Sequence, residues 1–285
     1  MDLRQLLWSV GNLTWPDSTE LICGESAHPA GHVCVPVPEG TPLDDLVEQL
    51  ANWYGEPLTE DSELPPSLPA VAPGGWRYAW PSGGRWVALG DAQATDPARL
   101  LLVVAHRPVP APGGTSADEP WPDRLVTLTG WIPRAYEVDW ASVESRLGNR
   151  LPSDYKRLVE VFGRGQFDGF FQILMPEEVI SYAETNKKLG QDPWEPHPPF
   201  PASGGILTWA GNEHEQSFYW VTEDPDPDRW TVYVTDVGPD PGTRFDCTAT
   251  EFLHRQLAGP RHPSSHPAAI RAHWFQACSS PDDLS

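Results

Sequence analysis

Basic side chains are scarce in this sequence of 285 residues. Lysine and arginine together number 19 against 40 aspartates and glutamates, so the formal net charge is −21 at pH 7. No run of basic residues offsets this balance, although nucleic-acid binding needs a clustered cationic surface to neutralise the phosphate backbone. The composition therefore argues against a nucleic-acid-binding protein and predicts that the chain attracts cationic partners.

Long apolar runs are also absent from the sequence. The longest one, Leu100–Ala105, has six residues, whereas a helix that spans a membrane needs about 20. The first residues lack the basic and apolar regions of a secretory signal. We therefore expect a cytoplasmic protein without membrane contact. In that compartment the four cysteines should be free thiols, and they are Cys23, Cys34, Cys247 and Cys278.

Proline is abundant, with 33 residues, and it is densest in residues 107–124, which read RPVPAPGGTSADEPWPDR. This segment has no hydrophobic periodicity and is typical of a linker. It predicts an N-terminal domain over residues 1–106 and a C-terminal domain over residues 125–259. Residues 260–285 are expected to form a loosely ordered tail, apart from a short helix at 268–275.

Both domains mix helical and strand patterns, which predicts an α+β fold class. In the N-terminal domain the order is α-β-β-α-β-β-β, with the first helix ending at Gly11, the second beginning at Thr41-Pro42, and strands over 21–23, 32–37, 76–80, 85–89 and 100–106. In the C-terminal domain, helices are expected at 140–147, 154–162 with Ser153 as the N-cap, 176–189 and 248–258, and strands at 170–174, 206–210, 218–221 and 230–235.

The C-terminal domain also carries an ordered set of short motifs. The stretch 138–176 reads VDWASVESRLGNRLPSDYKRLVEVFGRGQFDGFFQILMP and includes Leu147-Gly148, Leu151-Pro152, Asp154-Tyr155-Lys156 and Phe162-Gly163. Further along come Trp209-Ala210-Gly211-Asn212, Phe218-Tyr219-Trp220 and Thr250-Glu251-Phe252-Leu253. In order and spacing, residues 130–258 resemble the SUKH superfamily, which groups fungal cell-wall regulators of the SMI/KNR type with bacterial immunity proteins. The motifs that carry this resemblance lie in the C-terminal domain, and we identify no family resemblance for the N-terminal domain.

This resemblance implies a mostly antiparallel sheet with packed helices, and a binding function without catalysis or cofactor. The arginine-to-lysine ratio of 16 to 3 is consistent with a GC-rich bacterial genome. The sequence thus predicts an immunity protein that neutralises a cognate toxin by direct binding, a basic nuclease being a natural target. Two alternatives are a regulatory scaffold of cell-wall synthesis and, less favoured, an enzyme whose activity lies in the N-terminal domain.

Acidic residues follow the predicted strands of the C-terminal domain, with aromatic residues close in sequence. If the loops between these strands gather at one end of the sheet, they form a negative surface with aromatic anchors, a combination common in tight interfaces. The binding hypothesis therefore names Glu213, Glu215, Tyr219, Trp220, Glu223, Asp224, Asp226 and Asp228. Glu213 and Glu215 also flank His214, but no catalytic motif accompanies them.

Two patterns suggest metal binding. Cys23, His28, His32 and Cys34 could supply two thiolates and two imidazoles to zinc, but their C-x4-H-x3-H-x-C spacing departs from common zinc motifs. Hairpin thiols with exposed turn histidines are the preferred interpretation, and zinc is the weaker alternative. The acidic segment 224–235 lacks the glycine and the final glutamate of a calcium loop, so a solvated turn is expected there.

Overall fold

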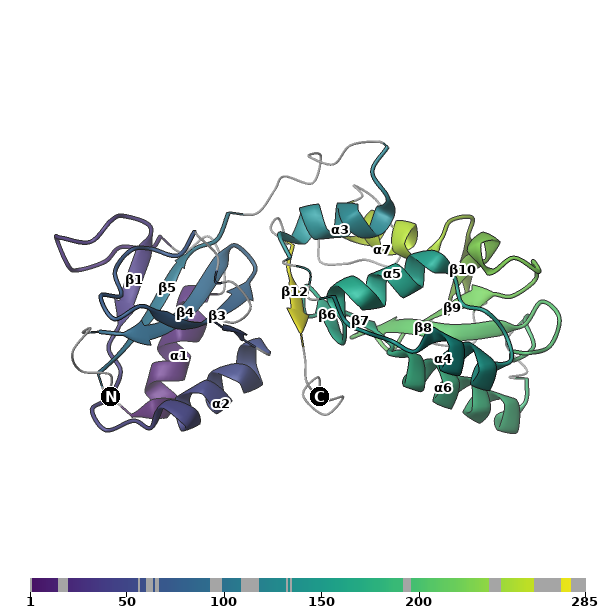
Figure 1. Ribbon diagram of the computed structural model, residues 1–285, viewed down its shortest axis with the longest axis horizontal. Helices are drawn as coiled ribbons and strands as arrows, with labels where there is room; N and C mark the ends of the chain where they lie inside the picture. Colours follow the sequence, from purple (N-terminus) through teal and green to yellow (C-terminus); the bar gives the residue numbers. More distant parts are fainter. Residues whose placement is uncertain are drawn as a thin grey trace. The chain divides into compact units, whose positions relative to one another are not determined.

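The computed structural model divides the chain into two compact units, one of residues 1–110 with 272–285 and one of residues 111–271 (Figure 1). Each unit combines helices with a mostly antiparallel sheet, which confirms the α+β fold class. The boundary between the units falls inside the expected linker. The described residues are 2–14, 20–55, 57–59, 64, 67–92, 99–108, 118–131, 133, 135–191, 196–235, 242–258 and 273–277.

The sheet of the first unit has the strand order β1-β5-β4-β3-β2, and all of its neighbouring strands are antiparallel. Its central strand β4 is buried at all seven positions, so both of its faces are covered. The strands are β1 (His32–Val35), β2 (Leu58–Thr59), β3 (Trp76–Ser82), β4 (Arg85–Asp91) and β5 (Leu100–His106). Residues 21–23, which were expected to form a strand, adopt no regular structure.

Two helices, α1 (Leu3–Thr14) and α2 (Leu43–Tyr54), bury their apolar stripes on one face of this sheet. The first helix continues through Gly11, which therefore does not end it as expected. A side chain at Gly11 would touch only the ring of Trp53, at 3.3 Å. The second helix ends at Gly55, whose φ of 79° favours glycine.

The segment 273–277 belongs to the first unit, and β12 (Phe275–Ala277) lies against β3. The buried guanidinium of Arg107 donates a hydrogen bond to the carbonyl of His273 at 3.5 Å. Phe275 lies in a strand and not in the expected short helix, because burial alternates residue by residue here, a period of two. The rest of the expected tail lies outside the described residues.

The end of the expected linker is helical. Helix α3 (Trp121–Thr129) begins directly after Pro120 and has a second proline in its first turn. Prolines are compatible with the first turn of a helix, since its N–H groups have no partners within the helix. The proline-rich composition predicted a linker over residues 107–124, but its last residues form the first turn of a helix.

In the second unit the strands follow the order β11-β10-β9-β8-β7-β6. The two strands missing from the sequence-based expectation, β6 and β11, have three residues each, too few for a visible alternation. The strands are β6 (Gly165–Phe167), β7 (Phe171–Ile173), β8 (Ile206–Asn212), β9 (Ser217–Val221), β10 (Thr231–Val234) and β11 (Thr243–Phe245).

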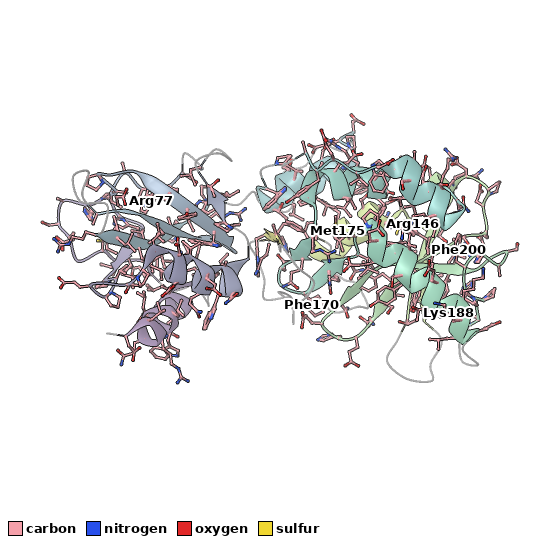
Figure 2. All side chains as sticks on the ribbon, turned by 60° about the horizontal axis from the view of Figure 1, so that its bottom comes forward. Arg77, Arg146, Phe170, Met175, Lys188 and Phe200 are labelled. Atoms are coloured by element: carbon pink, nitrogen blue, oxygen red, sulfur yellow. The ribbon has the colours of Figure 1, made fainter. Side chains whose placement is uncertain are left out.

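Helices cover both faces of this sheet. Aromatic residues of α5 (Ser153–Phe162) and α7 (Ala249–Ala258) pack on the face that carries Trp209 and Trp220. Helix α6 (Pro176–Leu189) packs beside α4 (Trp140–Leu147) and contacts β8 from the opposite face (Figures 1 and 2). Among the described residues, none of the helices has the length and apolar character that crossing a membrane requires.

Asp154 joins the starts of two helices that are far apart in the sequence. One of its carboxylate oxygens accepts hydrogen bonds from the backbone N–H and the hydroxyl of Thr250, at 3.0 and 2.8 Å. The other accepts the N–H of Tyr155 at 2.8 Å. The first turn of α7 is therefore capped by a side chain of α5, a contact that a sequence-local capping box does not include.

Replacing Asp154 by alanine should lower the free energy of unfolding of the second unit by about 1–3 kcal/mol, because a charged acceptor for three donors is lost. Chemical denaturation of the full chain measures this change. The matched control is Glu177→Ala, which breaks an exposed ion pair with Arg146 and should cost at most about 1 kcal/mol. Equal losses in both variants would refute the capping role.

Candidate metal centre and acidic loops

The acidic residues proposed for binding do not gather at one end of the sheet. Strands β8, β9 and β10 form an antiparallel meander, and successive turns of a meander lie at alternate ends of its strands. Residues 213–216 therefore lie at one end and residues 222–230 at the other. Two further acidic residues that follow in the sequence, Asp236 and Asp240, lie outside the described residues.

The turn of residues 213–216, named here the acidic turn, is exposed at its first three positions, Glu213, His214 and Glu215. The side chain of Asn212 holds it by accepting the N–H groups of His214 and Gln216 at 3.0 and 3.1 Å. Glu215 takes a φ of 61°, in the left-handed region. Among the described residues, no cation forms an ion pair with either glutamate of this turn, so both charges face solvent.

The turn between β6 and β7 lies next to the acidic turn. The N–H of Glu213 donates to the carbonyl of Phe170 at 3.1 Å, and the rings of Phe170 and His214 meet edge to face at 4.9 Å. Phe170, labelled in Figure 2, is itself buried. Two turns from different hairpins thus form one surface at this end of the sheet.

The carboxylates of the β9–β10 loop are engaged within the protein. Arg244 donates two hydrogen bonds to Glu223, and this interaction lowers the pKa of Glu223 below its usual value. Asp224 and Asp226 form exposed or half-exposed ion pairs with Arg229 and Arg150. The charge of this loop is largely balanced locally, which weakens it as a binding surface.

The three aspartates of this loop also organise its backbone. Asp224 accepts the N–H of Asp226 at 2.9 Å, and Asp228 accepts the N–H of Ser153, at the start of α5, at 2.5 Å. Their carboxylates are therefore directed at backbone donors, and the arrangement agrees with a structured turn in place of a calcium loop.

The aromatic residues proposed as anchors differ in exposure. Trp220 is fully buried and stacks on Trp209, with ring centroids 5.9 Å apart, and Trp230 is buried as well. Tyr219 points to the other face of the sheet and is half-buried against Tyr233. The assignment of Trp220 to a contact surface is therefore wrong, because strand alternation directs it into the core.

In the first unit, Cys23, His28, His32 and Cys34 come together at the edge of the sheet. Each presents one possible ligand atom, and these four atoms all lie within 4.8 Å of one another. His32 and Cys34 are two residues apart on β1 and share a face, whereas Cys23 and His28 belong to the preceding loop. His32 is fully buried, so the expectation of exposed turn histidines is wrong for this residue.

Burial dominates the electrostatics of this cluster. It raises the pKa of the Cys34 thiol to about 12, with Cys23 acting in the same direction. It also lowers the pKa of His32, and the neighbouring His28 lowers it further, against an opposing hydrogen bond with the backbone of Pro29. Without a cation beside them, the Cys34 thiol and the His32 imidazole are therefore favoured in their neutral forms.

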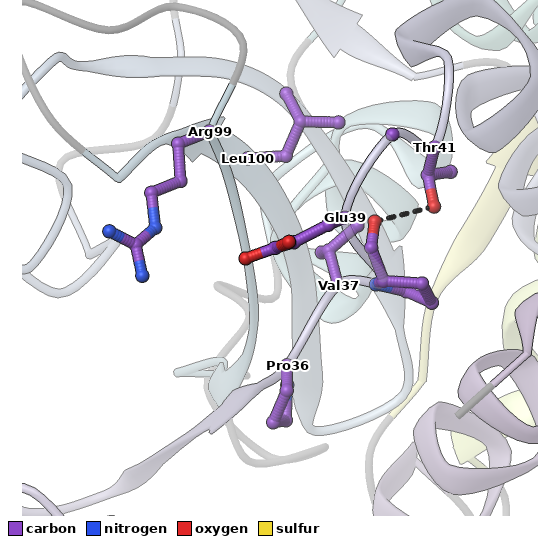
Figure 3. Close-up of a pocket in the computed structure, with 8 residues that line it drawn as sticks. Pro36, Val37, Glu39, Thr41, Arg99 and Leu100 are labelled. Carbon is purple, nitrogen blue, oxygen red and sulfur yellow. Dashed lines mark hydrogen bonds between the residues drawn. The ribbon is translucent and has the colours of Figure 1, made fainter.

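A cavity of about 520 Å³ lies elsewhere in the first unit, between the segment after β1 and the start of β5 (Figure 3). Thr41 donates a hydrogen bond to the carbonyl of Pro38 at 2.8 Å on one wall. The ionisable lining residues are Glu39 and Arg99. Its lining includes no thiol, hydroxyl–imidazole pair or carboxylate pair, and we assign it no chemistry.

Comparisons of the chain with protein-family models, with curated proteins and with solved structures found no match.

Proposed function

We propose that the chain is a non-catalytic protein-binding protein, and specifically a bacterial immunity protein that neutralises a toxin by direct binding. The proposal depends on the SUKH-like motifs, since the comparisons with known proteins provide no relative. Its main support is that these motifs occupy the positions in the second unit that build an α+β domain: they supply helix ends, core residues and strand pairs.

Particular motif residues illustrate this support. Gly148 ends α4 in the left-handed conformation, with a φ of 76°. Tyr155 is fully buried and donates its hydroxyl to the carbonyl of Leu174 at 2.6 Å. Gly163 adopts a φ of 70° beside the ring of Tyr136, where a Cβ would lie 2.3 Å from a ring carbon. Each position has a structural reason for its residue type, as expected of a scaffold-forming motif.

The acidic turn is the part of the second unit best suited to meet a basic partner. Its two glutamates are exposed and have no ion-pair partner among the described residues, whereas Glu223, Asp224 and Asp226 of the β9–β10 loop form ion pairs. Exposed charge at an interface accelerates association more than it strengthens the final complex. We therefore assign the steering of the toxin to Glu213 and Glu215, and a scaffolding role to Asp224, Asp226 and Asp228.

The proposal is tested by co-expressing the full chain with the toxin domain encoded beside its gene. We expect growth rescue, a complex of one chain with one toxin domain, and association that slows as salt rises. A toxin domain that stays active and unbound in the presence of the chain would contradict the proposal. So would a chromosomal neighbourhood without any toxin gene, which favours the cell-wall scaffold.

Charge reversal examines the role of the acidic turn. The double variant Glu213→Lys/Glu215→Lys should slow association about tenfold at low salt, as measured by stopped-flow or surface plasmon resonance. The control is Glu48→Lys/Glu184→Lys, which changes the net charge equally at exposed positions on α2 and α6. If both double variants slow association to the same degree, net charge and not the acidic turn is responsible.

A further inference from the structure

One nitrogen in the first unit makes more close contacts than hydrogen bonding can explain. The Nδ1 atom of His28 lies 3.5 Å from the sulfur of Cys23, 3.5 Å from the sulfur of Cys34 and 3.4 Å from Nε2 of His32. An imidazole nitrogen offers a single position, either one N–H or one lone pair. Three partners around one such atom indicate that all four groups are directed at a common point.

Four of the six separations among these ligand atoms match the edges of a zinc tetrahedron. Zinc binds thiolate sulfur at about 2.3 Å and imidazole nitrogen at about 2.0–2.1 Å in tetrahedral geometry, which requires edges of ~3.8 Å between sulfurs, ~3.5 Å between sulfur and nitrogen and ~3.3 Å between nitrogens. In the cluster the two sulfurs lie 3.8 Å apart, and the other close separations are 3.4–3.5 Å. No separation among the four atoms exceeds 4.8 Å.

We propose that Cys23, His28, His32 and Cys34 bind one Zn²⁺ ion as a structural centre of the first unit. Two soft thiolates with two imidazoles in a tetrahedron are a ligand set that selects zinc. Two thiolates also cancel the double charge of the ion, so the partly buried centre is neutral as a whole. With four protein ligands the coordination sphere is closed, which is typical of a structural and not of a catalytic site.

A disulfide does not account for the cluster. The sulfurs of Cys23 and Cys34 lie 3.8 Å apart, whereas a disulfide bond is about 2.05 Å long. A bond between the cysteines would also leave the approach of His28 and His32 to each other unexplained. The sequence spacing C-x4-H-x3-H-x-C is unusual because the last two ligands come from an extended strand, where residues i and i+2 share a face.

The centre has a clear structural task. The residues between Leu21 and Gly31 form no helix or strand. The N–H of His28 donates a hydrogen bond to the carbonyl of Glu25 at 3.1 Å, which closes a turn in this segment. The ion would tie this segment at two points to β1, which pairs with β5 on its other side. Zinc binding would thus stabilise the folded conformation of this loop at the sheet edge, as apolar packing stabilises the rest of the unit.

The test is the metal content of the full chain purified without chelator, measured by inductively coupled plasma mass spectrometry. We expect one zinc per chain in the parent protein and background levels in Cys34→Ser and in His28→Ala. The matched control is Cys247→Ser, which removes a buried thiol of the second unit and should retain the full zinc content. Zinc at parental levels in Cys34→Ser, or no zinc uptake by the reduced parent chain, would overturn the proposal.

A second measurement needs no variant and so does not depend on whether variants fold. Replacing zinc by Co²⁺ in the parent chain should give the intense visible absorption and the thiolate-to-metal charge-transfer band of a tetrahedral thiolate site. Alkylation followed by peptide mapping should then show Cys23 and Cys34 protected by the metal and reactive after chelation. A weak octahedral spectrum, or equal alkylation with and without metal, would contradict a closed centre. These outcomes are independent of toxin binding by the second unit.

Discussion

Stripping the metal from the full chain with a strong chelator is expected to lower the melting temperature of the first unit by about 15 °C or more. A ligand that binds only the folded state at 1,000 times its dissociation constant contributes about 4 kcal/mol. For a domain of this size each kcal/mol corresponds to roughly 4 °C or more. Differential scanning calorimetry measures the change, and hydrogen exchange assigns it to β1, β5 and residues 20–31.

The second unit serves as the internal control for this experiment. Exchange of the amides in β8 and β9 should be the same with and without the chelator, since the proposed ligands all belong to the first unit. Adding one equivalent of zinc should restore the original melting temperature. Unchanged exchange in β1 after complete removal of zinc would show that the metal does not stabilise this unit.

Truncating Phe252 to alanine should destabilise the second unit by about 3–5 kcal/mol. This residue of α7 is fully buried, and its ring lies 5.2 Å from that of Phe218 and 6.3 Å from that of Trp209, measured between centroids. The loss combines the transfer free energy of the ring with the cost of the cavity it leaves. Urea denaturation of the full chain, monitored by hydrogen exchange of the amides in β8 and β9, measures the loss of stability of the second unit.

The matched control for this variant is Leu189→Ala. Leu189, at the end of α6, is 79% exposed, so its truncation should change the free energy of unfolding by no more than about 0.5 kcal/mol. A loss below about 1 kcal/mol for Phe252→Ala would mean that α7 does not close the core of the second unit. The role of the Thr250-Glu251-Phe252-Leu253 motif as a core element would then fail.

Periodicity predicted the larger elements because each buries a regular stripe or face. The helices at 140–147 and 176–189 and the strand at 100–106 have the expected bounds. The N-terminal helix extends past Gly11, since a glycine with ordinary helical φ is tolerated at modest cost. Short elements such as β6 lie below the length at which periodicity is informative.

The candidate sites were harder to predict because they depend on pairing in three dimensions. The acidic residues follow strands in the sequence, but the meander of β8, β9 and β10 places successive loops at opposite ends of the sheet. In addition, Arg244 of β11 forms an ion pair with Glu223, which follows β9. Burial of Trp220 follows from alternation along β9, which places Phe218 and Trp220 on the same buried face.

The metal cluster illustrates the same limit. Its residue types were visible, but the spacing did not match common zinc motifs. The reason is structural, because a loop brings Cys23 and His28 over the face of β1 that carries His32 and Cys34. The informative sequence signal was the H-x-C pair within a strand, since alternation places both side chains on one face.

X-ray absorption at the zinc edge of the purified full chain measures the coordination of this cluster most directly. We expect two sulfur ligands at about 2.3 Å and two nitrogen ligands at about 2.0–2.1 Å, with no exchangeable water. A zinc edge whose first shell contains only oxygen and nitrogen, or a protein that carries no zinc after reconstitution, would contradict the proposed centre.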